Sequence, residues 1–190
     1  GGITFSLDDK FIFYSKLDQN HRPRKIFRHK IGDLVKNDEL IFEEKSEAFS
    51  VGLSLSSDEK YFFINTSDHN TSEQYYFASN EKKPKPKLIK KRKKGIIYSV
   101  NSWNGYFYNH TNENAEDFKI DICDDLSNQN WKTYLPAKEE VLIGGLTFLK
   151  NWILRGEVSN ALGKIFVKNV ETNIEEEIKF ADEKVIDPGI

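Results

Sequence analysis

The sequence predicts an all-β protein, part of a β-propeller, because one short pattern returns along the chain. Residues 5–14 read F-S-L-D-D-K-F-I-F-Y, and residues 55–64 read L-S-S-D-E-K-Y-F-F-I. The turn and the apolar strand after it return, with a less regular turn sequence, at residues 104–108 and 150–154. A period of about 45 residues built from short strands is typical of propellers with four strands in each blade. No stretch of about twelve residues shows the 3.6-residue apolar period of a helix.

Turn-forming residues divide the repeats into strands. Asp and Asn hydrogen-bond their own backbone in turns, and Pro and Gly interrupt the ladder of a strand. Four blades are expected at residues 1–47, 48–94, 95–139 and 140–190. The strands expected within them are 3–6, 10–16, 24–30 and 39–43; 49–55, 60–66, 74–79 and 86–89; 96–101, 106–111, 118–122 and 131–135; and 141–148, 152–157, 164–170 and 175–180.

The four predicted blades do not look like a closed ring. The Gly-His and Trp-Asp signatures of regular propellers are missing, and the chain begins with Gly1 and has no methionine. We therefore expect a piece of a larger ring whose two end blades expose apolar side chains, with Phe11, Phe13, Trp152 and Phe166 as candidates. Because large exposed apolar patches mark interfaces, the fragment is expected to self-associate as a two-fold dimer.

Composition limits the classes of partner. The 190 residues carry a net charge of −2, so no overall field favours nucleic acid or membrane, and we expect neither as a partner. No apolar run approaches the ~18 residues of a membrane span, and no signal-peptide pattern opens the chain. The single cysteine, Cys123, excludes an internal disulfide and is compatible with a reducing cytoplasm, where we expect the protein.

One segment departs from this balance. Residues 82–94 read K-K-P-K-P-K-L-I-K-K-R-K-K, with nine basic residues in thirteen. Such runs can bind nucleic acid or act as addresses. The two prolines and the central Leu88 and Ile89 favour a solvated outer edge strand and the connection to the next blade, since Lys and Pro on an edge discourage strand addition.

Neither a catalytic nucleophile nor a metal or cofactor site is predicted. The nearest approach to a G-x-S-x-G elbow is residues 52–56, G-L-S-L-S, which lacks the second glycine and lies in an alternating strand. The four histidines fall in no metal-ligand spacing, and His29 is expected to be a hydrogen-bonded strand residue. Cys123 is expected to pack as a small apolar residue.

The loop at residues 67–73, S-D-H-N-T-S-E, is the one candidate functional segment. It connects the second and third strands of the second blade, and propeller loops of this kind gather at one face of the ring. A plain surface turn is the competing interpretation. If the loop faces a ligand, Asp68, His69 and Glu73 are the candidate substrate-facing residues, and the two carboxylates would favour a basic substrate by a modest, screened Coulomb attraction.

A resemblance to a known family rests on several pieces in order. Residues 21–32 read H-R-P-R-K-I-F-R-H-K-I-G and are followed by L-I-F-E-E-K, T-S-E, I-Y-S-V, F-Y and N-W. These pieces are similar to the propeller of the prolyl oligopeptidase family of serine peptidases, in its oligopeptidase B (protease II) branch. The resemblance covers essentially the whole chain, although residues 82–94 are unusually basic for it.

The resemblance implies a seven-bladed propeller that caps a C-terminal α/β-hydrolase domain of the same parent chain. The Ser-Asp-His triad would lie in that domain, outside this segment, and the propeller would admit short peptides that are cleaved after Arg or Lys. Two alternatives remain open: a scaffold or protein-binding propeller without a hydrolase partner, and the propeller of prolyl oligopeptidase itself.

Overall fold

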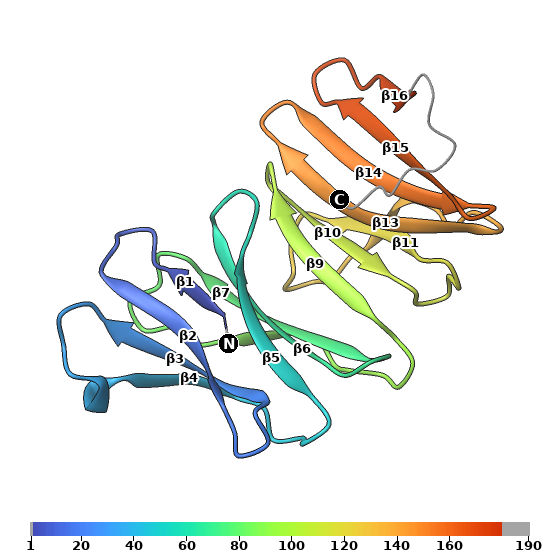
Figure 1. Cartoon of the computed structure of the whole chain (residues 1–190). Helices are drawn as coiled ribbons and strands as arrows, with labels where there is room; N and C mark the ends of the chain where they lie inside the picture. Colours follow the sequence, from blue (N-terminus) through green and yellow to red (C-terminus); the bar gives the residue numbers. More distant parts are fainter. Residues whose placement is uncertain (1, 180–190) are drawn as a thin grey trace. The chain divides into compact units, whose positions relative to one another are not determined.

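The structure is a computed structural model and describes residues 2–179. It contains four four-stranded antiparallel sheets and one short 3₁₀ turn at Val35–Asn37, which confirms the all-β prediction (Figure 1). Every described strand end lies within two residues of its expected position; for the last strand, only the expected end at Phe180 lies outside the described residues. The four blade boundaries stay a prediction. Within residues 2–179 the structure holds no helix of the length and hydropathy that a membrane span requires.

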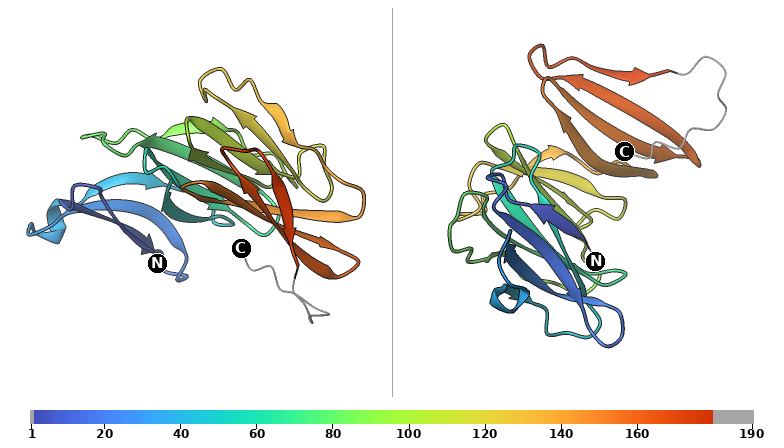
Figure 2. Two further views of the ribbon diagram at one scale, coloured as in Figure 1. Left: turned by 90° about the horizontal axis from the view of Figure 1, so that it is seen from above. Right: turned by 60° about the vertical axis from the view of Figure 1, so that its left-hand side comes forward.

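Each sheet is built from strands that are consecutive in the chain. The strands, given sheet by sheet, are β1 Ile3–Phe5, β2 Phe11–Leu17, β3 Pro23–Lys30 and β4 Glu39–Glu43; β5 Ser50–Leu55, β6 Tyr61–Ser67, β7 Ser72–Ala78 and β8 Lys87–Lys90; β9 Tyr98–Trp103, β10 Tyr106–Thr111, β11 Lys119–Cys123 and β12 Lys132–Leu135; and β13 Val141–Leu149, β14 Trp152–Ser159, β15 Leu162–Asn169 and β16 Glu175–Ile178. The spatial order within every sheet follows the chain order, so β4, β8, β12 and β16 are edge strands (Figure 2).

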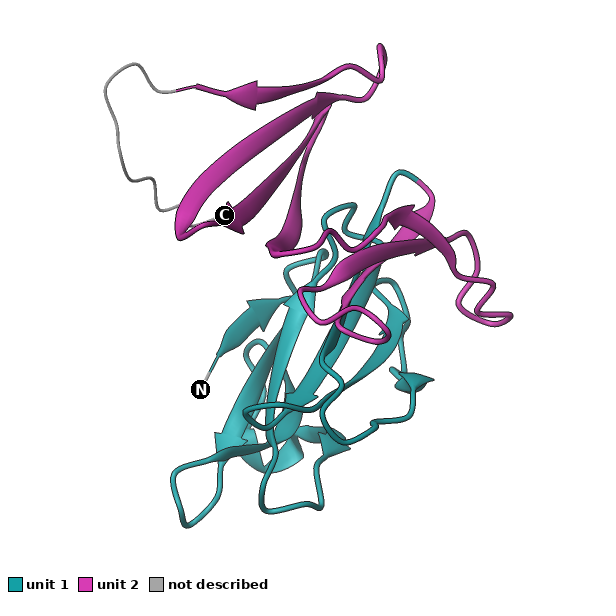
Figure 3. Ribbon diagram, turned by 90° about the vertical axis from the view of Figure 1, so that its right-hand side faces the viewer, with its two compact units in different colours: residues 1–104 teal, residues 105–190 magenta. Residues whose placement is uncertain are grey.

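The chain divides into two compact units, residues 1–104 and 105–190 (Figure 3). In the first unit, the core lies between the first two sheets. Phe13 and Ile26 from the first sheet pack against a group from the second sheet that includes Phe62 and Phe77. The ring centroids of Phe13 and Phe62 are 4.9 Å apart. Burying side chains of this size contributes about 1.5–3 kcal/mol each, so this cluster is the main source of stability in the unit.

In the second unit, aromatic rings and buried aliphatic residues play the same part. Tyr108 packs on Phe148 with ring centroids 4.8 Å apart, and it meets Tyr134 edge to face with centroids 5.4 Å apart. Ile143, on the same strand β13 as Phe148, is fully buried. β10 and β13 contribute to this core without strict alternation of burial: three consecutive residues of β10 are buried, and the register of β13 shifts between Ile143 and Leu146.

The repeated pattern folds into the same turn twice. Ser6 Oγ donates to Asp8 Oδ1 at 2.7 Å and accepts the backbone N–H of Phe11 at 3.0 Å. Ser56 does the same with Asp58 and Tyr61, at 2.8 and 3.0 Å. These bonds stabilise a turn whose following residue has positive φ, 56° at Asp9 and 60° at Glu59. The sequence repeat is thus a repeat of hydrogen-bonding chemistry.

The expected exposed aromatics are only partly exposed. Phe13 is buried in the core at 3% exposure, so its assignment to an open blade flank was wrong. It alternates with half-buried residues on β2 and its side chain faces the second sheet. Phe11 is half-buried under the Arg28 guanidinium, and Phe166 under that of Arg155. Trp152 remains 41% exposed, as expected.

Candidate functional site: the β6–β7 turn and the ionic network beside it

The β6–β7 turn is shorter than the sequence indicated. Ser67 ends β6 and pairs directly with Ser72, which begins β7. Asp68 accepts backbone N–H groups from Asn70 at 2.9 Å and Thr71 at 2.8 Å through one carboxylate oxygen. The hydrogen bond from Asn70, followed by that from Thr71, holds the pKa of Asp68 below its ordinary value despite partial desolvation. Asp68 therefore shapes the turn.

His69 and Glu73 lie in different surroundings. The His69 side chain is exposed at the turn, beside Asp68 in sequence. Glu73, which we expected in the loop, lies inside β7 opposite Thr66 and is 5% exposed. The polar sequence indicated a loop here. Its last residues belong to β7 instead, because other segments provide hydrogen-bond partners for their side chains. The substrate-facing role of the three residues stays a prediction, and only Asp68 and His69 belong to the turn itself.

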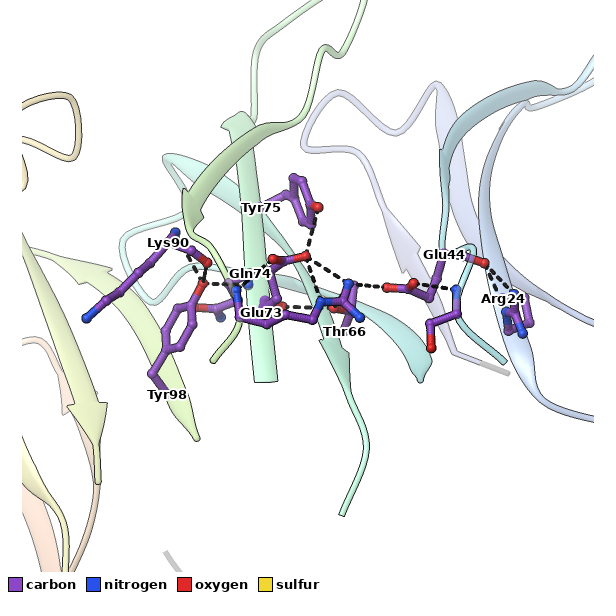
Figure 4. A network of polar contacts seen from close by, with 10 residues as sticks. Arg24, Glu44, Thr66, Glu73, Gln74, Tyr75, Lys90 and Tyr98 are labelled. Carbon is purple, nitrogen blue, oxygen red and sulfur yellow. Dashed lines mark hydrogen bonds and ion pairs between the residues drawn. The ribbon is translucent and has the colours of Figure 1, made fainter. Parts of the chain in front are cut away.

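Glu73 is held by Arg92, the only arginine of residues 82–94. The Arg92 side chain donates to Glu73 Oε2 from Nε at 3.1 Å and from Nη2 at 2.8 Å, and its backbone N–H donates to Oε1 at 2.8 Å (Figure 4). Nη2 also donates to Glu44 Oε2 at 2.6 Å. The guanidinium lies over the Phe49 ring, 4.0 Å from its centroid. One arginine thus joins the end of the first sheet to the middle strands of the second.

The charges in this network are fixed at neutral pH. Burial alone would raise the pKa of Glu73, but the hydrogen bonds from Arg92 outweigh it and leave that pKa below the ordinary value. Burial would lower the pKa of Arg92, and its two carboxylate partners raise it instead. Burial and the hydrogen bond to Glu73 raise the pKa of Tyr75 to about 12. With an ionised pair and a neutral phenol, the network serves as a clamp and not as an acid–base pair.

On its other side, β7 is joined to β9 through side chains. Ser72 Oγ donates to the Tyr98 carbonyl and accepts the Tyr98 backbone N–H, both at 2.7 Å. Gln74 Oε1 accepts the Val100 N–H at 2.6 Å, and the Gln74 N–H donates to the Tyr98 hydroxyl at 2.8 Å. Side-chain hydrogen bonds therefore join the two strands in place of a backbone ladder. Figure 4 shows the bond between Gln74 and the Tyr98 hydroxyl. Sequence reasoning missed this because the partners are about 25 residues apart.

The described residues hold no activated nucleophile. Ser54, the serine of the imperfect elbow, accepts a hydrogen bond from Asn65 on the neighbouring strand. His29 Nδ1 lies 2.6 Å from Asp38, whose other oxygen accepts the Tyr14 hydroxyl, so His29 is the hydrogen-bonded strand residue that was predicted. Within residues 2–179, no histidine hydrogen-bonds a serine, threonine or cysteine side chain in the manner of a base with its nucleophile.

The remaining candidate groups are also in structural positions. The His110 Nε2 lies 2.7 Å from the Ile143 carbonyl oxygen, and burial lowers the pKa of His110. Cys123 is buried, and burial raises the pKa of its thiol to about 11, so the thiol stays protonated and packs as a small apolar group. Among residues 2–179, no three His, Cys, Asp or Glu side chains come together to ligate a metal ion.

Comparisons with known proteins agree with this architecture. Residues 1–186 match the family model described as prolyl oligopeptidase, N-terminal beta-propeller domain. The chain is 34% identical over 157 residues to Protease 2 of Moraxella lacunata, an alignment that covers 76% of this chain and 23% of that protein. It is 27% identical over 147 residues to the human Prolyl endopeptidase-like protein, covering 76% of this chain and 20% of that one.

Solved structures show the same fold. Oligopeptidase B from Trypanosoma brucei, in a closed form with covalently bound antipain, superposes with a TM-score of 0.89 and 21% identity, over 97% of this chain and 28% of that one. Oligopeptidase B from Leishmania major gives a TM-score of 0.87 with 20% identity, over 96% and 27% of the two chains. The chain spans about a quarter of the length of these relatives. It belongs to the prolyl oligopeptidase family, within whose N-terminal β-propeller domain residues 1–186 lie.

Proposed function

We propose that this chain is part of the substrate-gating propeller of an oligopeptidase B-like serine endopeptidase that hydrolyses short peptides after Arg or Lys. The observation that carries the proposal is the 34% identity to Protease 2 over three quarters of the chain, above the 27% to the Prolyl endopeptidase-like protein. The absence of a nucleophile–base pair among residues 2–179 is compatible with a catalytic α/β-hydrolase domain elsewhere in the parent protein.

The proposed gate works by size. A propeller mounted over a catalytic cavity admits an unfolded short peptide and excludes a folded domain, so it needs no recognition motif. Rigid sheets serve this purpose, and the Arg92 network and the β7–β9 side-chain bonds supply rigidity where the sheets meet. Asp68 at the β6–β7 turn adds a carboxylate with a lowered pKa, which stays ionised at neutral pH and would attract basic peptides if the turn faces the cavity.

The test uses the full-length parent protein and reporter peptides that differ only in the residue before the scissile bond. We expect turnover after Arg and Lys, weak or no turnover after Pro, inhibition by a serine-directed reagent, and no cleavage of a folded protein that contains the same sites. Preferential cleavage after Pro would favour the prolyl oligopeptidase alternative. No peptidase activity, in a parent sequence without a serine elbow, would favour the scaffold alternative.

The contribution of the turn is tested separately. Asp68→Asn keeps the side-chain acceptor that shapes the turn and removes only the charge. We expect a modest rise in KM for dibasic peptides, weaker at high salt, with kcat unchanged. Asp124→Asn, at an exposed aspartate on another sheet connection, is the matched control and should leave KM unchanged. A large fall in kcat for Asp68→Asn would place the turn in the chemistry itself.

Self-association of the isolated chain is a further expectation. The first sheet exposes Ile3, Phe5 and Leu40, at 68%, 55% and 48%, as an apolar surface that a neighbouring blade would cover in a complete ring. We expect light scattering over a concentration series to show a dimer that dissociates on dilution. A strictly monomeric chain at high micromolar concentration would contradict this expectation.

A further inference from the structure

The segment 82–94, which we call the lysine tract, concentrates the positive charge of the molecule. It holds nine of the chain's 28 basic residues and none of its 30 acidic ones, so the other 177 residues carry a net charge of −11. The overall charge of −2 therefore hides a strong local separation of charge. A local positive field of this kind attracts anions within about one Debye length, roughly 8–10 Å at cellular salt.

Most of the charge in the tract is free to act on a partner. Seven of its lysines are exposed: Lys82, Lys83, Lys85, Lys87, Lys91, Lys93 and Lys94. No ion pair joins any of these seven ammonium groups to a carboxylate of residues 2–179. Some lysines elsewhere are paired, as in Lys25–Glu43 at 3.1 Å and Lys119–Asp121 at 2.9 Å. The tract differs from the rest of the chain because seven unpaired lysines lie within thirteen residues that contain no acidic side chain.

The tract bends at Lys82 and Lys83 and then runs without a further bend into β8. Pro84 and Pro86 favour extended backbone at the residues before them, Lys83 and Lys85. The segment continues into the edge strand β8, which pairs with β7 on one side only. Alternate residues of an extended chain are about 6–7 Å apart. Lys83, Lys85 and Lys87 therefore form a row of charges suited to a linear polyanion.

The other side chains of the tract exclude several kinds of polyanion. It contains no aromatic, amide or hydroxyl side chain that could stack on or read a nucleobase. It forms no helix, and Leu88 at 41% is its only exposed large apolar residue, which argues against insertion into a membrane interface. Its exposed cations are all lysines, which act as point charges without a fixed geometry. The tract can recognise charge and nothing else.

We propose that the lysine tract binds inorganic polyphosphate. In this polymer a single bridging oxygen separates neighbouring phosphates, whereas a sugar separates them along a nucleic-acid strand, so polyphosphate has a higher linear charge density than a single strand of nucleic acid. It also has no bases, which the tract could not engage. Each lysine that neutralises a phosphate releases condensed counterions, and this release drives binding. The proposal concerns a surface of the sheet edge and does not depend on the peptidase function.

The experiment measures binding of labelled polyphosphate to the 190-residue chain, and to the full-length parent, by fluorescence anisotropy at several salt concentrations. We expect a Kd on the order of 10⁻⁴–10⁻⁶ M near physiological salt that weakens steeply as salt increases. The triple variant Lys83→Gln, Lys85→Gln, Lys87→Gln should reduce the log–log salt slope by about 2–3, since each contact contributes about 0.7–0.9.

The matched control is Lys36→Gln, Lys132→Gln, Lys150→Gln, which removes the same charge at three exposed lysines outside the tract. Its slope should stay within about one unit of the wild-type value. An equal loss in the control, or no binding by the wild type, would overturn the proposal. Orthophosphate at the same phosphate concentration should not compete, and competition by it would also count against a linear polyanion.

Two other probes distinguish polyphosphate from other phosphate polymers and surfaces. A single-stranded oligonucleotide with the same number of phosphates should bind more weakly than polyphosphate, and phosphatidylserine vesicles should not bind at moderate salt. Equal or tighter binding of the oligonucleotide, or binding of the vesicles, would show that the tract serves a different partner. Because the substituted lysines are exposed, the variants should keep the circular dichroism spectrum and Tm of the wild type.

Discussion

The first two sheets fold the same repeat, but their surroundings differ. In the pattern shared by residues 5–14 and 55–64, Ile12 and Phe62 occupy the same position. Phe62 is fully buried between the sheets, whereas Ile12 is only half-buried. The second sheet is covered by the first sheet and also joined to β9, while the first sheet has one open face among residues 2–104. The same sequence pattern therefore forms the same strand in both sheets, but the strand is more deeply buried in the second sheet.

The shared turns show the same difference in polar contacts. Asp8 and Asp58 close their turns with equivalent serine bonds. The second oxygen of Asp58 accepts the hydroxyl of Ser102 on β9 at 2.9 Å. The second oxygen of Asp8 lies 3.7 Å from Lys10 Nζ, in a pair that is more than half exposed. A local motif thus sets the turn, and the neighbouring strand decides how much that motif stabilises the protein.

The largest difference is expected for the paired core positions. Phe62→Ala should destabilise the protein by about 3–5 kcal/mol, because it removes a fully buried ring and leaves a cavity. Ile12→Ala should cost about 1–2 kcal/mol, because its side chain is half-buried. Urea unfolding followed by fluorescence gives both values. Equal losses would show that the open face of the first sheet is already covered in solution.

The next largest loss of stability is expected when Arg92 is substituted. Arg92→Met keeps much of the side-chain length over Phe49 but leaves the buried carboxylates of Glu44 and Glu73 without a cation. Breaking a buried pair from one side costs about 3 kcal/mol, so a large fall in stability is expected. Arg22→Met beside the first sheet is the control, since Arg22 is exposed and its side chain donates to a backbone carbonyl oxygen and holds no buried carboxylate. A loss below about 0.5 kcal/mol for Arg92→Met, within the usual range for surface substitutions, would contradict the clamp.

The dependence of stability on pH should also be affected more by a carboxylate of the second sheet than by one of the first. The pKa of Glu73 lies below its ordinary 4.5, so its ionised form contributes stability above that value. The contribution is lost as the pH falls through the lower folded-state pKa. Glu73→Gln should therefore flatten the acid side of the stability–pH curve. Glu43→Gln on the first sheet, at an exposed pair with Lys25, should leave the curve unchanged; a flattening in both variants would point to a global charge effect.

The smallest difference is expected at the turns. Asp58→Ala should cost about 1–2 kcal/mol, because it removes the turn acceptor and leaves Ser102 without its partner. Asp8→Ala should cost less, since its turn is exposed to water. Thermal unfolding of the two variants side by side measures the gap. Equal losses would mean that the Ser102 contact adds nothing to the local turn.

Much of the fold was predictable because its information is local. Alternating apolar residues and Ser-x-Asp turns identify strands and hairpins within a few positions, so the strand ends agree with expectation. The edge strand in residues 82–94 was also predicted correctly, as β8. The exposure of Phe13 was not, because the pattern of β2 does not say which of its faces meets another sheet.

The candidate site depended on long-range pairing, which a local pattern cannot supply. Glu73 looked like a loop carboxylate because its partner lies 19 residues away in a basic run. The one available signal was that Arg92 stands alone among eight lysines, and arginine is the residue that suits buried, bidentate pairs. Asp68 and His69 lie in the turn between Ser67 and Ser72, and their orientation toward a substrate stays a prediction.

The ion pair between Arg92 and Glu44 also has a consequence for folding kinetics. It joins residues 48 positions apart, and both sheets must be in place before the guanidinium can reach the carboxylate. Contacts that need such large loops to close form late, after the hairpins of each sheet. Weakening this pair should therefore leave the folding rate nearly unchanged and speed up unfolding. The clamp would act chiefly as a kinetic lock that lengthens the lifetime of the folded sheets.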